Sequence, residues 1–150
     1  MSNLRIGAPE DDAALEDWRH VHNTVVPDAA MSLDESRERV GKYVLEVVYD
    51  GDALVGCTTV RPPDGDGAAA TVIVRVLPEA RRRGIGATLF DRAMGQAAGY
   101  GAPAVETVVW AANLDGVRFA QARGFAEVDR YVPEPGAVAY LTLRRPSPGR

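Results

Sequence analysis

The stretch Thr71–Phe90, which reads TVIVRVLPEARRRGIGATLF, decides the fold. Its first part, 72–76, is apolar and mostly β-branched, which predicts a buried strand. Pro78 ends this strand, because proline has no amide hydrogen to donate to a neighbouring strand. A basic, glycine-containing turn follows at 81–86, and apolar residues spaced by four over 85–97 then predict a helix.

A buried strand, a basic turn and the start of a helix together form a device that binds anions. The free amides of a helix's first turn point outward, and the helix dipole favours negative charge there. Gly84 and Gly86 let the backbone approach a ligand closely, while the arginines before them add positive charge. The turn is therefore predicted to hold a phosphate or pyrophosphate.

Composition limits the other function classes. The 150 residues suit a single domain, 1–150, and the net charge of −4 argues against bulk electrostatic binding of nucleic acid. No apolar run or leader core indicates a membrane segment, so a cytoplasmic protein is expected. Cys57 is the only cysteine, and His20 and His22 lie two residues apart, so no metal site is expected.

The periodicity along the rest of the chain predicts a mixed α+β fold. Ser32 with Glu35 matches a capping box at the start of a short helix. The fold class is an α/β sandwich: a mixed, mostly antiparallel sheet of about seven strands with helices on both faces. Strands are expected at 4–6, 43–49, 53–61, 72–76, 105–110, 125–131 and 138–143, and helices around 14–25, 32–42, 85–98 and 114–123.

Two familiar nucleotide motifs do not fit the basic turn. No Gly-Lys-Ser/Thr follows it, and Leu89 stands where a Rossmann motif needs its third glycine. The residues Val76–Gly86, VLPEARRRGIG, instead resemble the acetyl-CoA signature of the GNAT superfamily of N-acetyltransferases, R/Q-x-x-G-x-G/A. Asn113 at the end of the next strand and Phe119 after it agree with this resemblance.

The resemblance implies a set of contacts to acetyl-CoA and no metal. In these folds the central strand and the strand after the signature helix splay apart, which exposes backbone groups to the pantetheine arm. Amides of the turn would hold the pyrophosphate, Arg81 would support the turn, and Asn113 and Phe119 would contact the cofactor. The implied binding residues are Val74, Arg75, Val76, Arg81, Arg82, Arg83, Gly84, Ile85, Gly86, Ala87, Asn113 and Phe119.

The sequence departs from the family pattern at one position that concerns proton transfer. Many members carry a tyrosine directly after the phenylalanine of the fourth helix, as general acid towards the departing thiolate, and Ala120 stands there in this chain. Tyr131 and Tyr140 on the last strands are the candidate substitutes. Glu106 and Glu134 are candidate general bases, with a water-mediated base as the alternative.

The resemblance predicts transfer of an acetyl group from acetyl-CoA to a primary amine of a small molecule or a peptide, by direct attack in a ternary complex. Ala120 motivates a rival hypothesis, a non-catalytic acyl-CoA-binding sensor or partner module. The acceptor pocket is expected between the loop Val25–Met31 and the turn Tyr131–Val138. The last strands could also carry a homodimer contact, which the sequence itself does not show.

Overall fold

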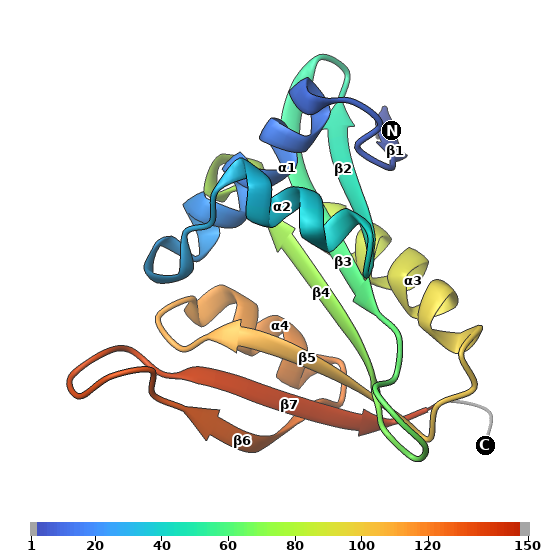
Figure 1. Cartoon of the computed structure of the whole chain (residues 1–150), viewed down its shortest axis with the longest axis vertical. Helices are drawn as coiled ribbons and strands as arrows, with labels where there is room; N and C mark the ends of the chain where they lie inside the picture. The colour runs from blue at the N-terminus through green and yellow to red at the C-terminus, as the bar shows by residue number, and fades with distance from the viewer. Residues whose placement is uncertain (1–2, 148–150) are drawn as a thin grey trace.

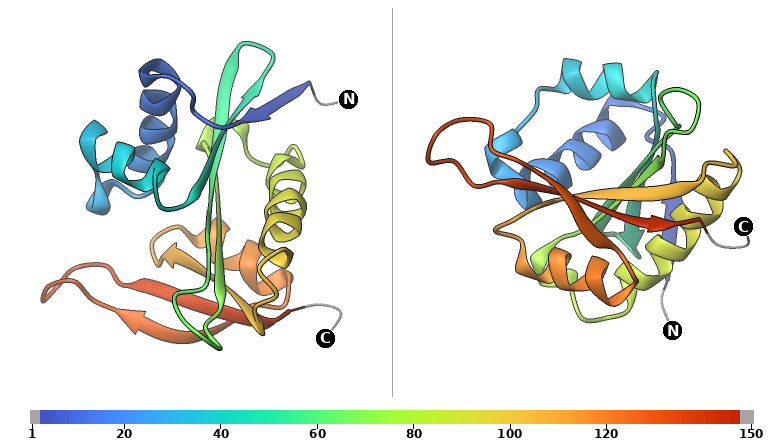
Figure 2. Two further views of the ribbon diagram at one scale, coloured as in Figure 1. Left: turned by 45° about the vertical axis from the view of Figure 1, so that its right-hand side comes forward. Right: turned by 90° about the horizontal axis from the view of Figure 1, so that it is seen from below.

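One seven-stranded sheet runs through the residues that the computed structural model describes, 3–147, with helices on both of its faces (Figures 1 and 2). The expected α+β class and element order are confirmed. The elements are β1 (Leu4–Gly7), α1 (Asp12–Val25), the 3₁₀ turn η1 (Pro27–Ala29), α2 (Leu33–Val40), β2 (Val44–Asp50), β3 (Ala53–Arg61), β4 (Ala70–Val76), the 3₁₀ turn η2 (Pro78–Ala80), α3 (Ile85–Ala98), β5 (Ala104–Trp110), α4 (Leu114–Ala122), β6 (Ala126–Tyr131) and β7 (Tyr140–Pro146).

Side-chain caps start the first two helices, and α1 begins at Asp12, two residues before the expected start. The Asp11 side chain accepts a hydrogen bond from the amide of Ala14 (2.8 Å), which starts α1. Both halves of the expected capping box are present at α2, since Ser32 and Glu35 each bond the other's backbone amide (3.1 and 3.0 Å). Within residues 3–147 no helix is long and apolar enough to cross a membrane.

The strand order is β1-β2-β3-β4-β5-β7-β6, so the last strand in sequence lies inside the sheet and β6 forms the edge. All neighbours pair antiparallel except β4 and β5, which pair in parallel as a strand–helix–strand unit requires. The last strand extends to Pro146, beyond the expected end at 143, because it pairs with β5 along the whole of that strand, from Ala104↔Pro146 to Trp110↔Tyr140.

β4 and β5 separate almost as soon as they meet. Only Ala70↔Val105 and Thr71↔Glu106 are paired between them. Each strand stays paired with its other neighbour, β4 with β3 as far as Val76 and β5 with β7 as far as Trp110. The sheet therefore opens into a V between its two halves, which Figure 1 shows as β4 and β5 diverging from the lower right.

The two faces of β4 differ in chemical character. Val74 and Val76 pack towards α3, beside the buried cluster that contains Ile85 and Leu89. Arg75 lies on the opposite face, because side chains alternate along a strand and its partner Cys57 belongs to the cluster under α1. The α3 face is thus apolar along this strand, whereas the α1 face carries a guanidinium group.

Candidate functional site

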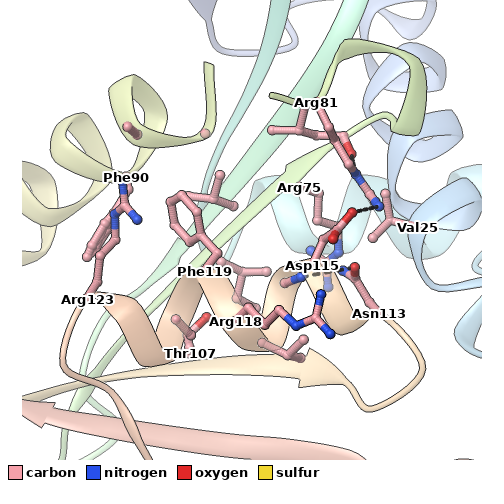
Figure 3. A pocket seen from close by; sticks show the side chains of 18 of the residues that line it. Val25, Arg75, Arg81, Phe90, Thr107, Asn113, Asp115, Arg118, Phe119 and Arg123 are labelled. Carbon is pink, nitrogen blue, oxygen red and sulfur yellow. Dashed lines mark hydrogen bonds and ion pairs between the residues drawn. The ribbon is translucent and has the colours of Figure 1, made fainter. Parts of the chain in front are cut away.

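A cavity of about 490 Å³ lies between β4 and β5 where the two strands diverge. Its walls come from β4 and β5, its ends from the turn before α3 and from α1, and its floor from α4 (Figure 3). Within residues 3–147 no group of three or more metal-ligating side chains gathers anywhere. The residues lining it that the arguments below use are Val25, Val26, Val74, Arg75, Val76, Arg81, Arg82, Gly84, Gly86, Trp110, Asn113, Phe119 and Ala120.

The turn before α3 presents free amides to one end of this cavity. Arg82 and Gly84 both have positive φ, 65° and 78°, which turns the chain sharply into the helix. No side chain caps α3, and Thr88 is the residue whose amide donates back to the Gly84 carbonyl oxygen (3.2 Å). The amides before Thr88 are left for another acceptor, so the helix start can bind an anion.

The three arginines of the turn have different positions. The Nε of Arg81 donates to the Val76 carbonyl oxygen (3.0 Å), and its Nη1 lies 3.4 Å from Asp115 Oδ2, as Figure 3 shows. Arg82 is exposed and lines the cavity. Arg83 lies outside the cavity lining, with its Nη1 3.6 Å from Asp50 Oδ2. Arg81 therefore braces the turn, and Arg82 is left to face a ligand.

The open edge of β4 offers the backbone of alternate residues. The Leu77 amide donates to the Val55 carbonyl oxygen on β3 (2.9 Å). Because backbone groups alternate sides along a strand, those of Arg75 also point to β3, and those of Val74 and Val76 point into the cavity. The cavity thus has a row of hydrogen-bonding groups along one wall.

The start of α4 closes the opposite side. Asn113 caps α4 by accepting from the Gly116 amide (3.1 Å), and it also lines the cavity. Phe119 packs edge-on against Phe90 with ring centroids 5.9 Å apart, and a Cβ on Gly86 would stand 3.2 Å from its ring. The helix start at Gly86 and the Phe119 ring are therefore in close contact, as glycine allows.

Comparisons with known proteins agree with this geometry. The family model described as the acetyltransferase (GNAT) family matches residues 11–125. The chain belongs to the GNAT acetyltransferase family. A search of curated protein sequences finds no significant match.

Solved structures share the GNAT fold over nearly the whole chain. The yncA protein of Salmonella typhimurium, solved with its cofactor acetyl-CoA, is 18% identical with a TM-score of 0.73 and covers 99% of this chain and 96% of its own. The ribosomal-protein-alanine N-acetyltransferase of Brucella melitensis is 20% identical (TM-score 0.70, 95% and 98% covered). Arabidopsis thaliana NAA60, in complex with a bisubstrate analogue, is 17% identical (TM-score 0.77, 98% and 99% covered). At these identities the likeness shows the fold alone.

None of the side chains that the sequence suggested for proton transfer lines the cavity of this GNAT fold. Glu106 pairs with Arg144 (Nε to Oε2, 2.8 Å) on the part of β5 that precedes the opening. Tyr131 is 61% exposed on the edge strand, and Glu134 is exposed in the β6–β7 turn. Tyr140 is half-buried and pairs across the sheet with Trp110, which does line the cavity. Tyr140 is therefore the candidate whose position is compatible with the site.

Burial shifts the pKa of groups around Tyr140. The pKa of the Tyr140 phenol is raised, first by burial and then by the charge of Asp28, so it stays protonated at neutral pH. Burial also raises the pKa of the Cys57 thiol to about 12 and lowers that of Arg75 to about 10. Cys57 is therefore a neutral packing residue, and Arg75 remains charged.

The expected acceptor pocket is only partly present in the cavity. Val25 and Val26 line it, whereas Met31 is buried in the core, where its backbone bonds the side chain of Asn23. The β6–β7 turn does not line the cavity, although it projects at the same end of the molecule as the loop between α1 and α2 (Figures 1 and 2). Sequence patterns missed Trp110, Arg118 and Arg123 as lining residues, and they predicted a role for the backbone of Arg75 where the residue that lines the cavity has its backbone paired with β3.

Proposed function

We propose that this protein transfers an acetyl group from acetyl-CoA to a primary amine in a ternary complex. The observation that carries the proposal is the V between β4 and β5, which ends at the uncapped start of α3. An extended chain with amide groups fits along the free edge of β4, and a diphosphate fits the free amides at the helix start. The solved yncA protein with acetyl-CoA supports this assignment.

The residues divide between the two ends of the ligand. Val74 and the amide of Val76 would pair with the pantetheine arm, since the Val76 carbonyl already accepts from Arg81, and the amides from Arg82 to Ala87 would hold the pyrophosphate. Arg81 would keep these two regions in register through its bond to Val76. Asn113 and Phe119 would contact the arm from the α4 side.

Acetyl-CoA, when bound, supplies a thioester whose carbonyl carbon is electrophilic. The acceptor's neutral amine nitrogen attacks that carbon, the carbon–sulfur bond breaks, and the nitrogen loses a proton while the sulfur gains one. The Val74 amide points into the cavity farther from the turn than Val76 and can stabilise charge on the carbonyl oxygen, an effect worth about 3–4 kcal/mol for one donor in other enzymes. Holding the two reactants in line contributes roughly 7–11 kcal/mol.

We assign to Tyr140 the role of general acid, which donates a proton to the departing sulfur. Many family members use a tyrosine at the position of Ala120 for this step. The Tyr140 phenol is protonated at neutral pH, because burial raises its pKa, and it lies on the Trp110 side of the cavity. The placements of Tyr131, Glu106 and Glu134 support no such role, so a water molecule is proposed as the base towards the amine.

The test is release of free thiol from acetyl-CoA in the presence of a panel of primary amines, with acetylated product measured by mass spectrometry. Thiol and product should appear in equal amounts and only with both substrates. Ala120 favours one other function, a non-catalytic acyl-CoA-binding module. Tight acetyl-CoA binding with no amine-dependent thiol release would support the module and contradict the transferase.

A further inference from the structure

Three arginines lie on the α1 side of the sheet, and one of them reaches the cavity. Arg75 on β4 lines the cavity, and Arg61 on β3 lies on the same face of the sheet. Arg39 lies in the last turn of α2, where its carbonyl oxygen accepts from the Tyr43 amide (2.9 Å). The Arg61 guanidinium stacks over the Tyr43 ring, 5.1 Å from its centroid. Arg61 and Arg75 share one face of neighbouring strands, and the charges of Arg61 and Arg39 contribute to lowering the pKa of Arg75, so we treat the three as one cationic cluster.

The cluster's arginines form no ion pair within residues 3–147, although the exposed carboxylate of Glu35 lies one helical turn before Arg39 and has its pKa lowered in part by that charge. Arg92 and Arg144, by contrast, pair with buried or half-buried carboxylates. The buried Nε of Arg61 has no hydrogen-bond acceptor at all.

Two titratable groups that interact with Arg75 are neutral at pH 7. Burial keeps the Cys57 thiol protonated, with a pKa raised to about 12, and keeps His22 unprotonated, with a pKa lowered to about 4. Asp28 raises the pKa of Tyr140 but forms no ion pair with Arg75. Burying neighbouring positive charges without anionic partners costs folding free energy. An arrangement with this cost is expected where the charges bind an anionic ligand.

The position of Arg75 on β4 indicates which of the two substrates its side chain would contact. Its backbone bonds β3, while Val74 and Val76 on either side of it turn their backbone groups to the cavity. Its side chain points to the α1 face, beside Val25 and Val26 at the end where we place the acceptor. A guanidinium group there is on the acceptor's side of the strand and away from the turn that would hold the pyrophosphate.

We propose that the acceptor is a small amine that also carries an anionic group, a carboxylate or a phosphonate, which Arg75 binds with Arg61 and Arg39 behind it. This inference rests on the proposed function and narrows its substrate class. The planar guanidinium matches both anions with paired hydrogen bonds. A peptide N-terminus presents an amide at the same distance from its amine and would leave the cluster unpaired.

Matched amines test the proposal. Leucine and methionine are compared with leucinamide and methioninamide, and 2-aminoethylphosphonate with ethylamine, by kcat/KM with acetyl-CoA. Each anionic amine should exceed its neutral match by roughly 10- to 100-fold, the range expected for a charged hydrogen bond. Arg75→Gln should remove this preference, and Arg75→Lys should retain part of it, because lysine keeps the charge without the fork.

Arg37→Gln is the matched control, since it removes one positive charge from the outer side of α2, where Arg37 pairs with Asp12 and Asp34. Its preference should equal that of the wild type. Equal rates for acids and amides in the wild type, or equal losses of preference in the two glutamine variants, would overturn the inference while leaving the transferase function standing.

Binding without turnover keeps the two proposals separate. Calorimetric titration of leucine and of 2-aminoethylphosphonate into protein saturated with CoA should show binding in the wild type and roughly 10- to 100-fold weaker binding in Arg75→Gln. No amine-dependent thiol release with this anion binding intact would contradict the transferase alone. No difference between anion and neutral match in this titration would contradict the anionic acceptor.

Discussion

Arg81 ties the turn before α3 to the end of β4, because its Nε donates a 3.0 Å hydrogen bond to the Val76 carbonyl oxygen. The same guanidinium reaches Asp115 at the start of α4 (3.4 Å). One side chain thus connects three walls of the cavity. Arg81→Met should weaken acetyl-CoA binding by about 10-fold, since a hydrogen bond to a charged group contributes roughly 1.5–3 kcal/mol.

Calorimetric titration of acetyl-CoA measures this effect. Arg130→Met is the control, because Arg130 pairs with Glu127 on the exposed edge strand, away from the cavity. Equal affinity in the wild type and the Arg81 variant would mean that the turn keeps its shape without this brace.

The glycines of α3 offer a second matched pair. Gly86→Val should abolish acetyl-CoA binding, because even a Cβ at this position would stand 3.2 Å from the Phe119 ring and crowd the helix start. Gly95 lies in the middle of the same helix with nothing within 4 Å of an added Cβ. Gly95→Ala should keep binding and raise the free energy of unfolding by up to about 1 kcal/mol. Titration and thermal unfolding of both variants measure these outcomes, and unchanged affinity in Gly86→Val would contradict the pyrophosphate assignment.

Removing the hydroxyl of Tyr140 and of Tyr131 in separate variants tests which of them donates the proton. Tyr140→Phe should lower kcat by about 10²- to 10⁴-fold if its phenol protonates the sulfur. Tyr131→Phe should have no effect, because that side chain is 61% exposed on the edge strand and, unlike Tyr140, is not paired with the cavity-lining residue Trp110. Since the pKa of Tyr140 is raised above the ordinary 10.0, the wild-type rate should lose this proton donor only above pH 10. A full rate in Tyr140→Phe would leave thiolate departure unassisted by this residue.

His22 should make stability depend on pH. It is 5% exposed and stacked on Trp18 with ring centroids 5.6 Å apart, and burial, then the charge of Arg75, lowers its pKa from 6.5 to about 4. The unfolded chain therefore binds a proton at this position between pH 6.5 and 4 that the folded protein does not. Stability present above pH 6.5 should fall by about 3 kcal/mol as the pH drops to 4.

The measurement is urea unfolding at several pH values for the wild type and His22→Gln, with the difference between them isolating this group from the carboxylates. The pH dependence assigned to His22 should be absent in the variant. In Arg75→Gln the pKa of His22, followed by NMR, should rise, because a nearby positive charge is gone. An identical pH dependence in wild type and His22→Gln would contradict the prediction.

Local sequence signals predicted the elements well and the site only in part. The proline after β4, the capping box at Ser32 and the glycines before α3 act within a few residues, so their structure can be inferred from the pattern itself. The end of β7 was misplaced, because its length is set by pairing with β5, a partner about 40 residues earlier in the chain.

The chemistry of the site depends on longer-range relations. Tyr131 and Tyr140 look equivalent in sequence, but only the strand order puts one beside Trp110 and the other on the sheet edge. Arg39 and Arg61 come from separate elements, and nothing in a one-dimensional pattern brings them to Arg75. The anion-binding turn was predictable because its parts are contiguous, whereas the acceptor side that we propose draws on residues of α1, α2, β3 and β4.

A crystal structure with acetyl-CoA bound tests the central claim most directly. We expect the pantetheine amides to pair with the backbone of Val74 and Val76, and the pyrophosphate to accept hydrogen bonds from the amides between Arg82 and Ala87. Acetyl-CoA bound away from the V between β4 and β5, or held there with those backbone groups unused, would contradict it.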